Sequence, residues 1–377
     1  MIESGRFCNQ LTMRGVGFFT GVPDSLLKSF CAWVTEHTSG KNHIIAVNEG
    51  AAIALASGYY LATEKIPLVY MQNSGIGNAV NPLLSLADGN VYRIPMVLLV
   101  GWRGEPGVKD EPQHLKQGKV TCALFEAMGI PYMVLSDLED EVKSQLEVCF
   151  AHIKKKNTPF ALIARKDTFV PFNTESGITT ATDPELSREE AIEEIILSSS
   201  PNGVFVSTTG MASRELYELR EKHNMDHERD FLTVGSMGHA SSLALALALQ
   251  KPELPVNCID GDAAVLMHMG SMAAIGERKP ANLRHFVLNN GAHDSVGGQP
   301  TIAHSIDLAG IARSVGYTQV HSVKTPEELR GVLNKSNGSL FIEVRVRKGN
   351  RKDLGRPRIG PQENKEAFMH FISKRIP

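Results

Sequence analysis

The sequence VNCIDGD at residues 256–262, followed by HFVLNNG at 285–291, decides the fold and directs the search for a site. Each stretch is a short apolar run that ends in Gly-Asp or Asn-Asn-Gly, which is typical of a buried strand followed by a turn. Asn290 comes 28 positions after Asp262, which is enough for one strand–helix–strand unit. The two strands of such a unit run parallel, so both polar turns are expected at one edge of the sheet, where open α/β sheets bind ligands.

Short apolar runs recur along the whole chain, separated by helix-length segments and by turns rich in glycine and proline. Alternating strands and helices predict an α/β protein built on doubly wound, mostly parallel sheets. The expected strands are 44–47, 68–71, 95–100, 160–164, 204–207, 231–234, 256–259, 285–288 and 340–346, and the expected helices include 50–62, 241–249 and 267–276.

The chain of 377 residues suits two domains. The order of strands, glycine-rich turns and helices in the first half is repeated in the second, by duplication or by the chance recurrence common in α/β proteins. A stretch rich in Thr, Pro, Gly and Ser precedes a capping box formed by Ser187 and Glu190. These signals predict one domain at 1–170, a linker at 171–187 and a second domain at 188–377.

Composition excludes several classes of function. The 39 basic and 41 acidic residues give a net charge of −2, which argues against nucleic-acid or membrane-surface partners. The five cysteines form no C-x-x-C pair, which fits a reducing compartment better than a disulfide framework or a zinc site. No apolar run approaches the roughly 20 residues of a membrane span. A globular, cytoplasmic protein is expected.

Asp262 and Asn290 carry the chemistry that the pattern predicts. Carboxylate and amide oxygens are the hard ligands that Mg²⁺ prefers, and this ion leaves positions for substrate phosphates. In a simpler interpretation, Asp262 caps the following helix and Asn289-Asn290 only makes a turn. The spacing of the two motifs favours the metal–diphosphate site.

Gly-Asp followed by Asn-Asn at this spacing resembles the diphosphate-binding signature of thiamine-diphosphate enzymes, and the resemblance covers essentially the whole chain. The first half resembles their pyrimidine-binding domain and the second their diphosphate-binding domain, without the middle domain of larger 2-oxoacid decarboxylases. GVPDS at 21–25, VNEGAA at 47–52 and EPQH at 111–114 are most similar to the phosphonopyruvate decarboxylase family, to which the sulfopyruvate decarboxylases are close. The resemblance implies a carboxy-lyase that converts 3-phosphonopyruvate to phosphonoacetaldehyde and CO₂, with 3-sulfopyruvate or another 2-oxoacid as the alternative substrate.

The resemblance also implies a cofactor set of thiamine diphosphate and Mg²⁺. Asp262, Asn290 and the carbonyl of Ala292 match the metal ligands of the family. The residues that match its cofactor-binding positions are Glu49, Thr208, Thr209, Gly210, Gly235, Met237, Gly261, Asp262, Ala263 and Asn290. Ala263 departs from the usual glycine, so a methyl group could alter how that turn approaches the diphosphate. Met237 would wedge between the two cofactor rings, or it is an ordinary methionine that fills a gap in the core.

Glu49 matches the glutamate that hydrogen-bonds the aminopyrimidine ring in this family. Apolar residues precede and follow it, which predicts a raised pKa and a carboxyl that can share a proton with the ring. The simpler interpretation is a helix N-terminal glutamate favoured by the macrodipole.

Asp24 and His114 match residues assigned to proton transfer. Gln113 stands where related decarboxylases carry the first histidine of a pair, so only His114 keeps a ring that titrates near neutral pH. In the alternative interpretation, His114 is a surface-loop histidine.

Basic groups that could receive an anionic substrate surround these positions. With Gln113, the candidates are Arg103, Lys109 and His293, joined by Lys116 and the basic stretch at 345–358. Most of these could instead form a solvated charged face, and residue types alone do not separate a phosphonate from a sulfonate.

Because Glu49 and the diphosphate anchor lie in different halves, a complete site needs both domain types. In the family they come from different chains, which implies a homodimer or a larger homo-oligomer. A dinucleotide-dependent oxidoreductase is the main rival, since NSGIG at 73–77 follows a strand, but Val80 stands at the third glycine position and no acidic residue ends the strand at 95–100. A thiamine-diphosphate-binding module without catalysis is disfavoured by Glu49.

Overall fold

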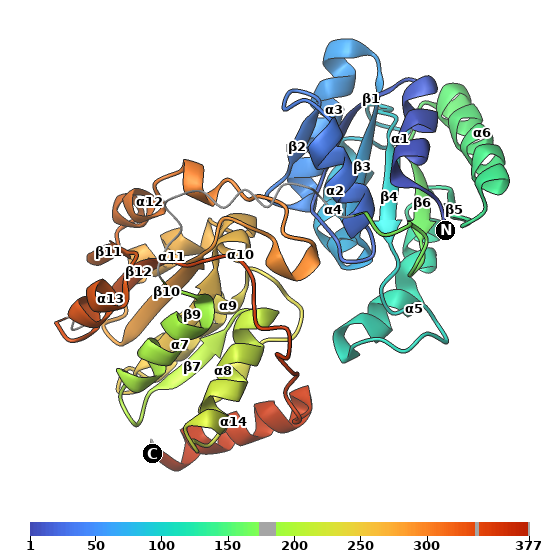
Figure 1. Ribbon diagram of the computed structural model, residues 1–377. Helices are drawn as coiled ribbons and strands as arrows, with labels where there is room; N and C mark the ends of the chain where they lie inside the picture. Colours follow the sequence, from blue (N-terminus) through green and yellow to red (C-terminus); the bar gives the residue numbers. More distant parts are fainter. Residues whose placement is uncertain (173–185, 336–338, 376–377) are drawn as a thin grey trace. The chain divides into compact units, whose positions relative to one another are not determined.

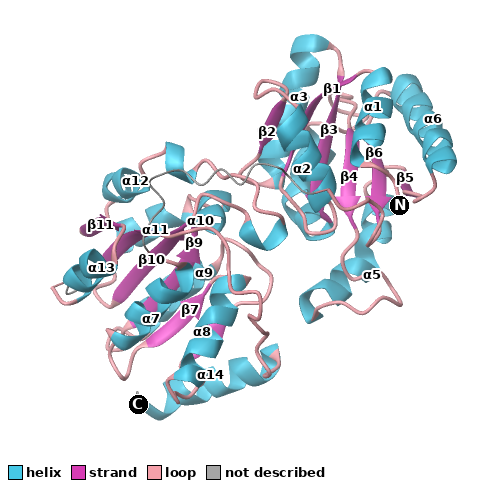
Figure 2. Ribbon diagram, viewed as in Figure 1, coloured by secondary structure: helices cyan, strands magenta, loops and turns pink. Residues whose placement is uncertain are grey.

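The computed structural model describes residues 1–172, 186–335 and 339–375. The chain divides into two compact units, Met1–Ile178 and Thr179–Pro377. Each unit contains a six-stranded parallel sheet that lies between helices (Figures 1 and 2). This architecture confirms the predicted fold class. Residues 173–185 of the predicted linker lie outside the described residues.

The sheet of the first unit has the strand order β2-β1-β3-β4-β6-β5. Alternate residues of β3 point to opposite faces: Leu68 and Tyr70 pack with α1, α2 and α6, whereas Val69 and Met71 pack with α3, α4 and α5. The elements are α1 (Ser4–Met13), β1 (Val16–Gly21), α2 (Lys28–His37), β2 (His43–Ile45), α3 (Glu49–Thr63), β3 (Ile66–Gln72), η1 (Asn73–Gly75), α4 (Ile76–Ser85), β4 (Val97–Gly101), α5 (Pro112–Ala127), β5 (Tyr132–Val134), α6 (Glu139–Lys156) and β6 (Phe160–Ala164).

The sheet of the second unit has the order β11-β12-β10-β9-β7-β8. Residues of α7, α8 and α13 form the core on one face, together with Phe205, Ile259 and Phe286 of the sheet. The elements are α7 (Arg188–Leu197), β7 (Val204–Ser207), α8 (Met211–Lys222), β8 (Asp230–Leu232), α9 (Ala240–Gln250), β9 (Val256–Gly261), α10 (Asp262–Met267), α11 (Ser271–Arg278), β10 (Leu283–Asn289), η2 (Asp294–Val296), η3 (Ala303–Ser305), α12 (Leu308–Val315), β11 (Gln319–Val323), α13 (Pro326–Leu333), β12 (Leu340–Arg345) and α14 (Pro361–Arg375).

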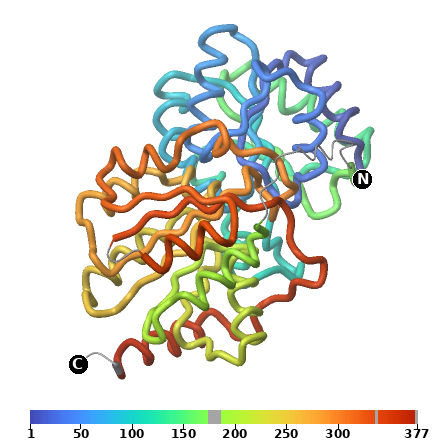
Figure 3. The backbone as a smooth tube through the Cα atoms, turned by 60° about the vertical axis from the view of Figure 1, so that its left-hand side comes forward, coloured from blue at the N-terminus to red at the C-terminus, as the bar shows by residue number. Residues whose placement is uncertain are grey.

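The segment after β12 leaves the sheet and runs to α14, as the red part of the chain shows in Figures 1 and 3. Asn364 of α14 accepts a hydrogen bond from Leu232 N (3.0 Å) and donates one to Asp230 O (2.7 Å). The C-terminal helix therefore satisfies backbone groups of β8, the edge strand, which would otherwise be open to pairing with another chain.

Three strands were not predicted, namely β1, β5 and β11. The last two are short edge strands whose side chains are only partly buried, so they lack the apolar run that marks a central strand. The single helix predicted at 267–276 is wrong, because α10 begins directly at Asp262 and α11 starts anew at Ser271. The predicted capping box at Ser187 and Glu190 is confirmed. No helix among the described residues has both the length and the apolar character needed to cross a membrane.

Candidate active site

Polar residues of the first unit gather where its parallel strands end. Asp24 follows β1, Glu49 follows β2, and Arg103 follows β4. Two hydrogen bonds link the ends of these strands to β3: Gln72 donates to Asp24, and Asn73 donates to the backbone oxygen of Arg103. The structure therefore brings the predicted residues of the first half to one edge of the sheet.

Glu49 begins α3, whose N-cap residue Asn48 accepts a hydrogen bond from Ala51 N (2.8 Å). The Glu49 side chain is buried, and its Oε2 accepts a hydrogen bond from Asn78 Nδ2 at 2.7 Å. Gly75 leaves room for this carboxyl, because a Cβ at that position would collide with Oε1. Burial raises the pKa of Glu49, although the bond from Asn78 opposes the effect. The raised pKa expected from the sequence is confirmed.

Asp24 is fully buried beside the end of β3. Its Oδ1 accepts from Gln72 Nε2 (2.6 Å), and its Oδ2 accepts from Leu26 N (3.0 Å). Burial raises the pKa of Asp24, while the two hydrogen bonds and the positive charge of Arg103 partly offset the rise. A carboxyl of this kind keeps its proton closer to neutral pH than an exposed one, which suits proton transfer.

The Arg103 side chain forms its hydrogen bonds with residues of neighbouring loops, mainly with Asp110 of its own loop. It donates Nε and Nη2 to the Asp110 carboxylate (2.8 and 2.5 Å) and Nη1 to Ser25 Oγ (2.8 Å). Gly104 N donates to the same carboxylate at 2.8 Å. The Asp110 carboxylate thus balances the positive charge of Arg103 within the loop. Arg103 is therefore less available to an anionic substrate than its place in the sequence suggests. Lys109, on the same loop, is exposed.

His114 lies in the first turn of α5, next to Gln113, whose Nε2 is 3.4 Å from His114 Nε2. Burial, followed by the positive charge of Arg103, lowers the pKa of His114 to about 4. The expectation that this ring titrates near neutral pH is therefore wrong, because the sequence did not reveal its burial. Gln117 lies close enough to the ring to oppose part of this decrease in the pKa.

In the second unit, the two turns that open the sequence analysis lie at one edge of the sheet. Strands β9 and β10 are paired in register up to Gly261 and Leu288, so Asp262 and Asn289-Asn290 leave the sheet side by side. The predicted common edge is confirmed.

Asp262 is the first residue of α10 and is almost fully buried. Its Oδ2 accepts a hydrogen bond from Thr301 Oγ1 at 2.5 Å, and Thr301 N donates to Gly291 O at 2.9 Å. Thr301 therefore joins the turn after β9 to the turn after β10. Burial raises the pKa of Asp262 to about 6, which Thr301 opposes and the nearby carboxylate of Asp294 reinforces.

Asn290 is the asparagine that lies at the edge of the sheet. Its Nδ2 donates to Asp294 Oδ2 (2.6 Å), and its Oδ1 accepts from Ala292 N (3.0 Å). The preceding Asn289 instead donates to the buried Glu343 Oε1 of β12 (2.7 Å), inside the core. The two asparagines thus have different surroundings, and only Asn290 belongs to the polar edge.

The turns after β7 and β8 are joined by a hydrogen bond from Gly235 N to Thr209 Oγ1 (3.0 Å). Gly235, Ser236 and Gly238 have positive φ (71°, 47° and 83°), a conformation that the two glycines adopt without strain. Met237 lies within this turn and is half-buried. The turns at 208–210 and 235–238 are thus in contact with each other.

Ala263 and His293 flank the two central turns. Ala263 is the second residue of α10, and its φ is negative, so its methyl group requires no left-handed backbone. The departure from glycine is therefore accommodated without strain. Burial lowers the pKa of His293 to about 4, so at neutral pH it offers a neutral N–H group, not a positive charge.

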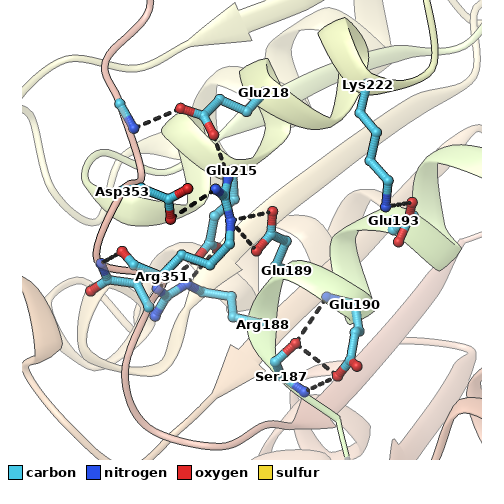
Figure 4. Close-up of polar contacts among 12 residues, drawn as sticks. Ser187, Arg188, Glu189, Glu190, Glu193, Glu215, Glu218, Lys222, Arg351 and Asp353 are labelled. Atoms are coloured by element: carbon cyan, nitrogen blue, oxygen red, sulfur yellow. Dashed lines mark hydrogen bonds and ion pairs between the residues drawn. The ribbon is translucent and has the colours of Figure 1, made fainter.

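Two arginines of the basic stretch at 345–358 form ion pairs with glutamates, which fits the charged-face interpretation for these positions. Arg347 pairs with Glu190. Arg351 pairs with Glu189 and Glu218, as Figure 4 shows. These ion pairs hold the stretch against α7 and α8.

The donor set at the second edge fits a hard divalent cation. Asp262, Asn290 and the backbone of Ala292 offer a carboxylate, an amide oxygen and a carbonyl. The negative charge of Asp294, another carboxylate, adds to the raised pKa of Asp262. A buried acid with a raised pKa and an acidic neighbour is a position where a cation would be strongly favoured.

Several residues that hold these groups were not predicted. In the first unit, Asn78 and Gln72 hold the carboxyls of Glu49 and Asp24. In the second, Thr301 donates to the Asp262 carboxyl and Asp294 accepts from the Asn290 amide. Of these, only Asp294 lies close in sequence to a predicted ligand.

Comparison with known proteins identifies the class. Residues 6–123 match the thiamine pyrophosphate enzyme, N-terminal TPP binding domain, and residues 208–344 match the C-terminal TPP binding domain of the same enzymes. Two parallel-sheet units with these polar edges therefore define a thiamine-pyrophosphate enzyme.

Full-length relatives give the family within this class. Phosphonopyruvate decarboxylase of Streptomyces hygroscopicus is 34% identical over 393 residues, an alignment that covers 100% of this chain and 96% of the relative. The chain belongs to the phosphonopyruvate decarboxylase family. Sulfopyruvate decarboxylase of Methanosarcina acetivorans is 28% identical over 381 residues, covering 95% of this chain and 94% of the relative. Among solved structures, benzoylformate decarboxylase from Polynucleobacter necessarius aligns with 93% of this chain and 100% of its own at 12% identity, with a TM-score of 0.37.

Proposed function

We propose that this chain decarboxylates 3-phosphonopyruvate to phosphonoacetaldehyde and CO₂ with thiamine diphosphate and Mg²⁺. The observation that carries the proposal is the 34% identity to a phosphonopyruvate decarboxylase along the entire chain. When bound, thiamine diphosphate supplies the electron sink for the loss of CO₂.

The second unit would hold the charged end of the cofactor. Asp262, Asn290 and the Ala292 carbonyl are the proposed Mg²⁺ ligands. Thr208, Thr209 and Gly210, with Gly235 and Gly261, would offer hydroxyl and N–H groups to the diphosphate. The support for this assignment is the chemistry of the donors and their burial at one edge of the sheet.

The first unit would supply the groups that transfer protons. Glu49 would hold a proton on its carboxyl and share it with the aminopyrimidine, which its raised pKa supports. Asp24 and His114 would move protons during product formation, with His114 acting from its neutral form because of its lowered pKa.

The substrate test measures CO₂ release from phosphonopyruvate, sulfopyruvate and pyruvate under saturating thiamine diphosphate and Mg²⁺. We expect the highest kcat/KM for phosphonopyruvate. The 28% identity to a sulfopyruvate decarboxylase over nearly the whole chain makes sulfopyruvate the second candidate. Equal or faster turnover of sulfopyruvate would overturn the substrate assignment and leave the decarboxylase assignment standing.

We also propose a homo-oligomer in which Glu49 of one copy and the Asp262 site of another serve the same cofactor. The predicted groups are divided between the two units, so complementation can test the assembly. The variants Glu49→Gln and Asp262→Asn should each be inactive alone. After subunit exchange between equal amounts of the two variants, about half of the dimers contain one chain of each. Such a dimer has one intact site out of two, so activity should return to about a quarter of wild type. No recovery from a verified mixed dimer would mean that each site is built within one chain.

A further inference from the structure

Asp294 receives hydrogen bonds from three separate parts of the second unit. Its Oδ2 accepts hydrogen bonds from Asn290 Nδ2 (2.6 Å), Arg188 Nη1 (3.1 Å) and Gly349 N (2.9 Å). The carboxylate and the guanidinium are both about nine-tenths buried, with 10% and 8% of their side chains exposed. Burial of a carboxylate at this level requires partners, and these three donors supply them.

Arg188 is itself held in place. Its Nε and Nη2 donate to both oxygens of Glu215 (2.7 and 2.8 Å), an arrangement with two parallel bonds that fixes the plane of the guanidinium. Figure 4 shows Arg188 of α7 and Glu215 of α8, which these bonds join. Asp294 is thus held by an arginine that has little freedom to move.

The charges around this group favour a cation. One guanidinium, that of Arg188, pairs with the two carboxylates of Glu215 and Asp294, and the buried Asp262 adds a third carboxylate to this edge. A divalent cation at Asp262 and Asn290 would balance the excess negative charge of this cluster.

The hydrogen bond to Asn290 has a direct consequence for a metal ligand. An amide can turn either its oxygen or its NH₂ group toward a given point, and only the oxygen can bind a cation. A carboxylate only accepts hydrogen bonds, so Asp294 holds the NH₂ group and directs the Asn290 oxygen away from itself.

We propose that Asp294 is a positioning residue for the metal site: it selects the amide orientation of Asn290 in which the oxygen faces the cation, and Arg188 fixes Asp294 for this task. The inference rests on the proposed function, because it takes Asn290 to be a metal ligand. The backbone N–H of Gly349 binds the same carboxylate, so the segment after β12 contributes to the arrangement.

The test measures metal binding directly. Mn²⁺ serves as the probe, with thiamine diphosphate present, and its free concentration is followed by electron paramagnetic resonance. Asp294→Ala removes Oδ2, the one oxygen that accepts from Asn290, Arg188 and Gly349, so the Asn290 amide loses the acceptor that fixes its orientation. We expect the Kd of this variant for Mn²⁺ to rise at least about 10-fold, as for other groups that orient a ligand, with kcat largely recovered at saturating metal.

Asp230→Ala is the matched control. Asp230 accepts from Arg220 Nε and Nη2 at 2.9 and 2.7 Å, a buried pair in the same unit that does not contact Asn290. It should lose stability but keep the wild-type Kd for Mn²⁺ within about twofold. If the Asp294 variant fails to fold, Arg188→Lys replaces it: the lysine keeps the charge without the paired bonds, and its Kd should also rise.

The outcomes separate the two proposals. A wild-type Kd for Asp294→Ala or for Arg188→Lys overturns the positioning role alone. A wild-type protein that binds no Mn²⁺ with thiamine diphosphate overturns the metal assignment and the positioning role together. A wrong substrate assignment leaves this measurement unchanged.

Discussion

Glu49→Gln is expected to reduce kcat by at least about 100-fold, the usual range for loss of a group that transfers a proton. The amide is nearly the same size as the carboxyl, and its oxygen can still accept the hydrogen bond from Asn78. The fold should therefore stay intact while the group can no longer hold and release a proton. Steady-state CO₂ release at saturating cofactor measures the effect, and circular dichroism checks the fold.

Glu327→Gln is the matched control for the simpler interpretation of Glu49. Glu327 is also a glutamate in the first turn of a helix, but its side chain is 74% exposed and far from any predicted site residue in the sequence. If Glu49 only complemented the helix macrodipole, both substitutions would cost less than about 1 kcal/mol of stability and leave turnover unchanged. Equal turnover of the two variants would remove Glu49 from the mechanism.

Much of the architecture was predictable because it depends on local sequence. Central strands such as β9 and β10 are continuous apolar runs, and each ends in a polar turn that the topology brings to a known edge. The raised pKa of Glu49 was also predictable, because apolar residues adjacent in sequence help to bury it. The edge strands β5 and β11 were missed because half-buried strands lack such runs.

The supporting contacts of the site were not predictable because they join distant parts of the chain. Thr301 lies 39 positions from Asp262, and Arg188 lies 106 positions from Asp294. His114 illustrates the same limit: its neutral state follows from burial of α5 against the loop that carries Arg103. Only the packed structure shows which polar side chains of the loops become partners.

Asp262→Asn is expected to increase the stability of the protein without metal while abolishing metal-dependent stabilisation. Burial raises the pKa of Asp262 from 3.8 to about 6, so the folded state resists ionisation of this group more than the unfolded chain does. The resulting cost is absent below about pH 4, grows between about pH 4 and 6, and reaches about 3 kcal/mol above that range. Asparagine cannot ionise and avoids this cost.

Urea unfolding in EDTA at pH 4.5 and pH 7.5 measures this effect. The variant should exceed wild type by up to about 3 kcal/mol at pH 7.5, and by much less at pH 4.5, where the wild-type carboxyl is mostly protonated in the folded state. Mg²⁺ with thiamine diphosphate should stabilise wild type strongly and the variant little, because the ion binds the folded state through the carboxylate.

Asp307→Asn controls for the helix position, since Asp307 caps α12 by accepting from Gly310 N, and asparagine caps equally well. Its stability should follow wild type at both pH values, and Mg²⁺ with thiamine diphosphate should stabilise it fully. A buried carboxylate that costs stability without its cation is the expected trade-off at a binding site, because the structure is adapted to the loaded state. Full Mg²⁺-dependent stabilisation of Asp262→Asn would show that the cation binds elsewhere.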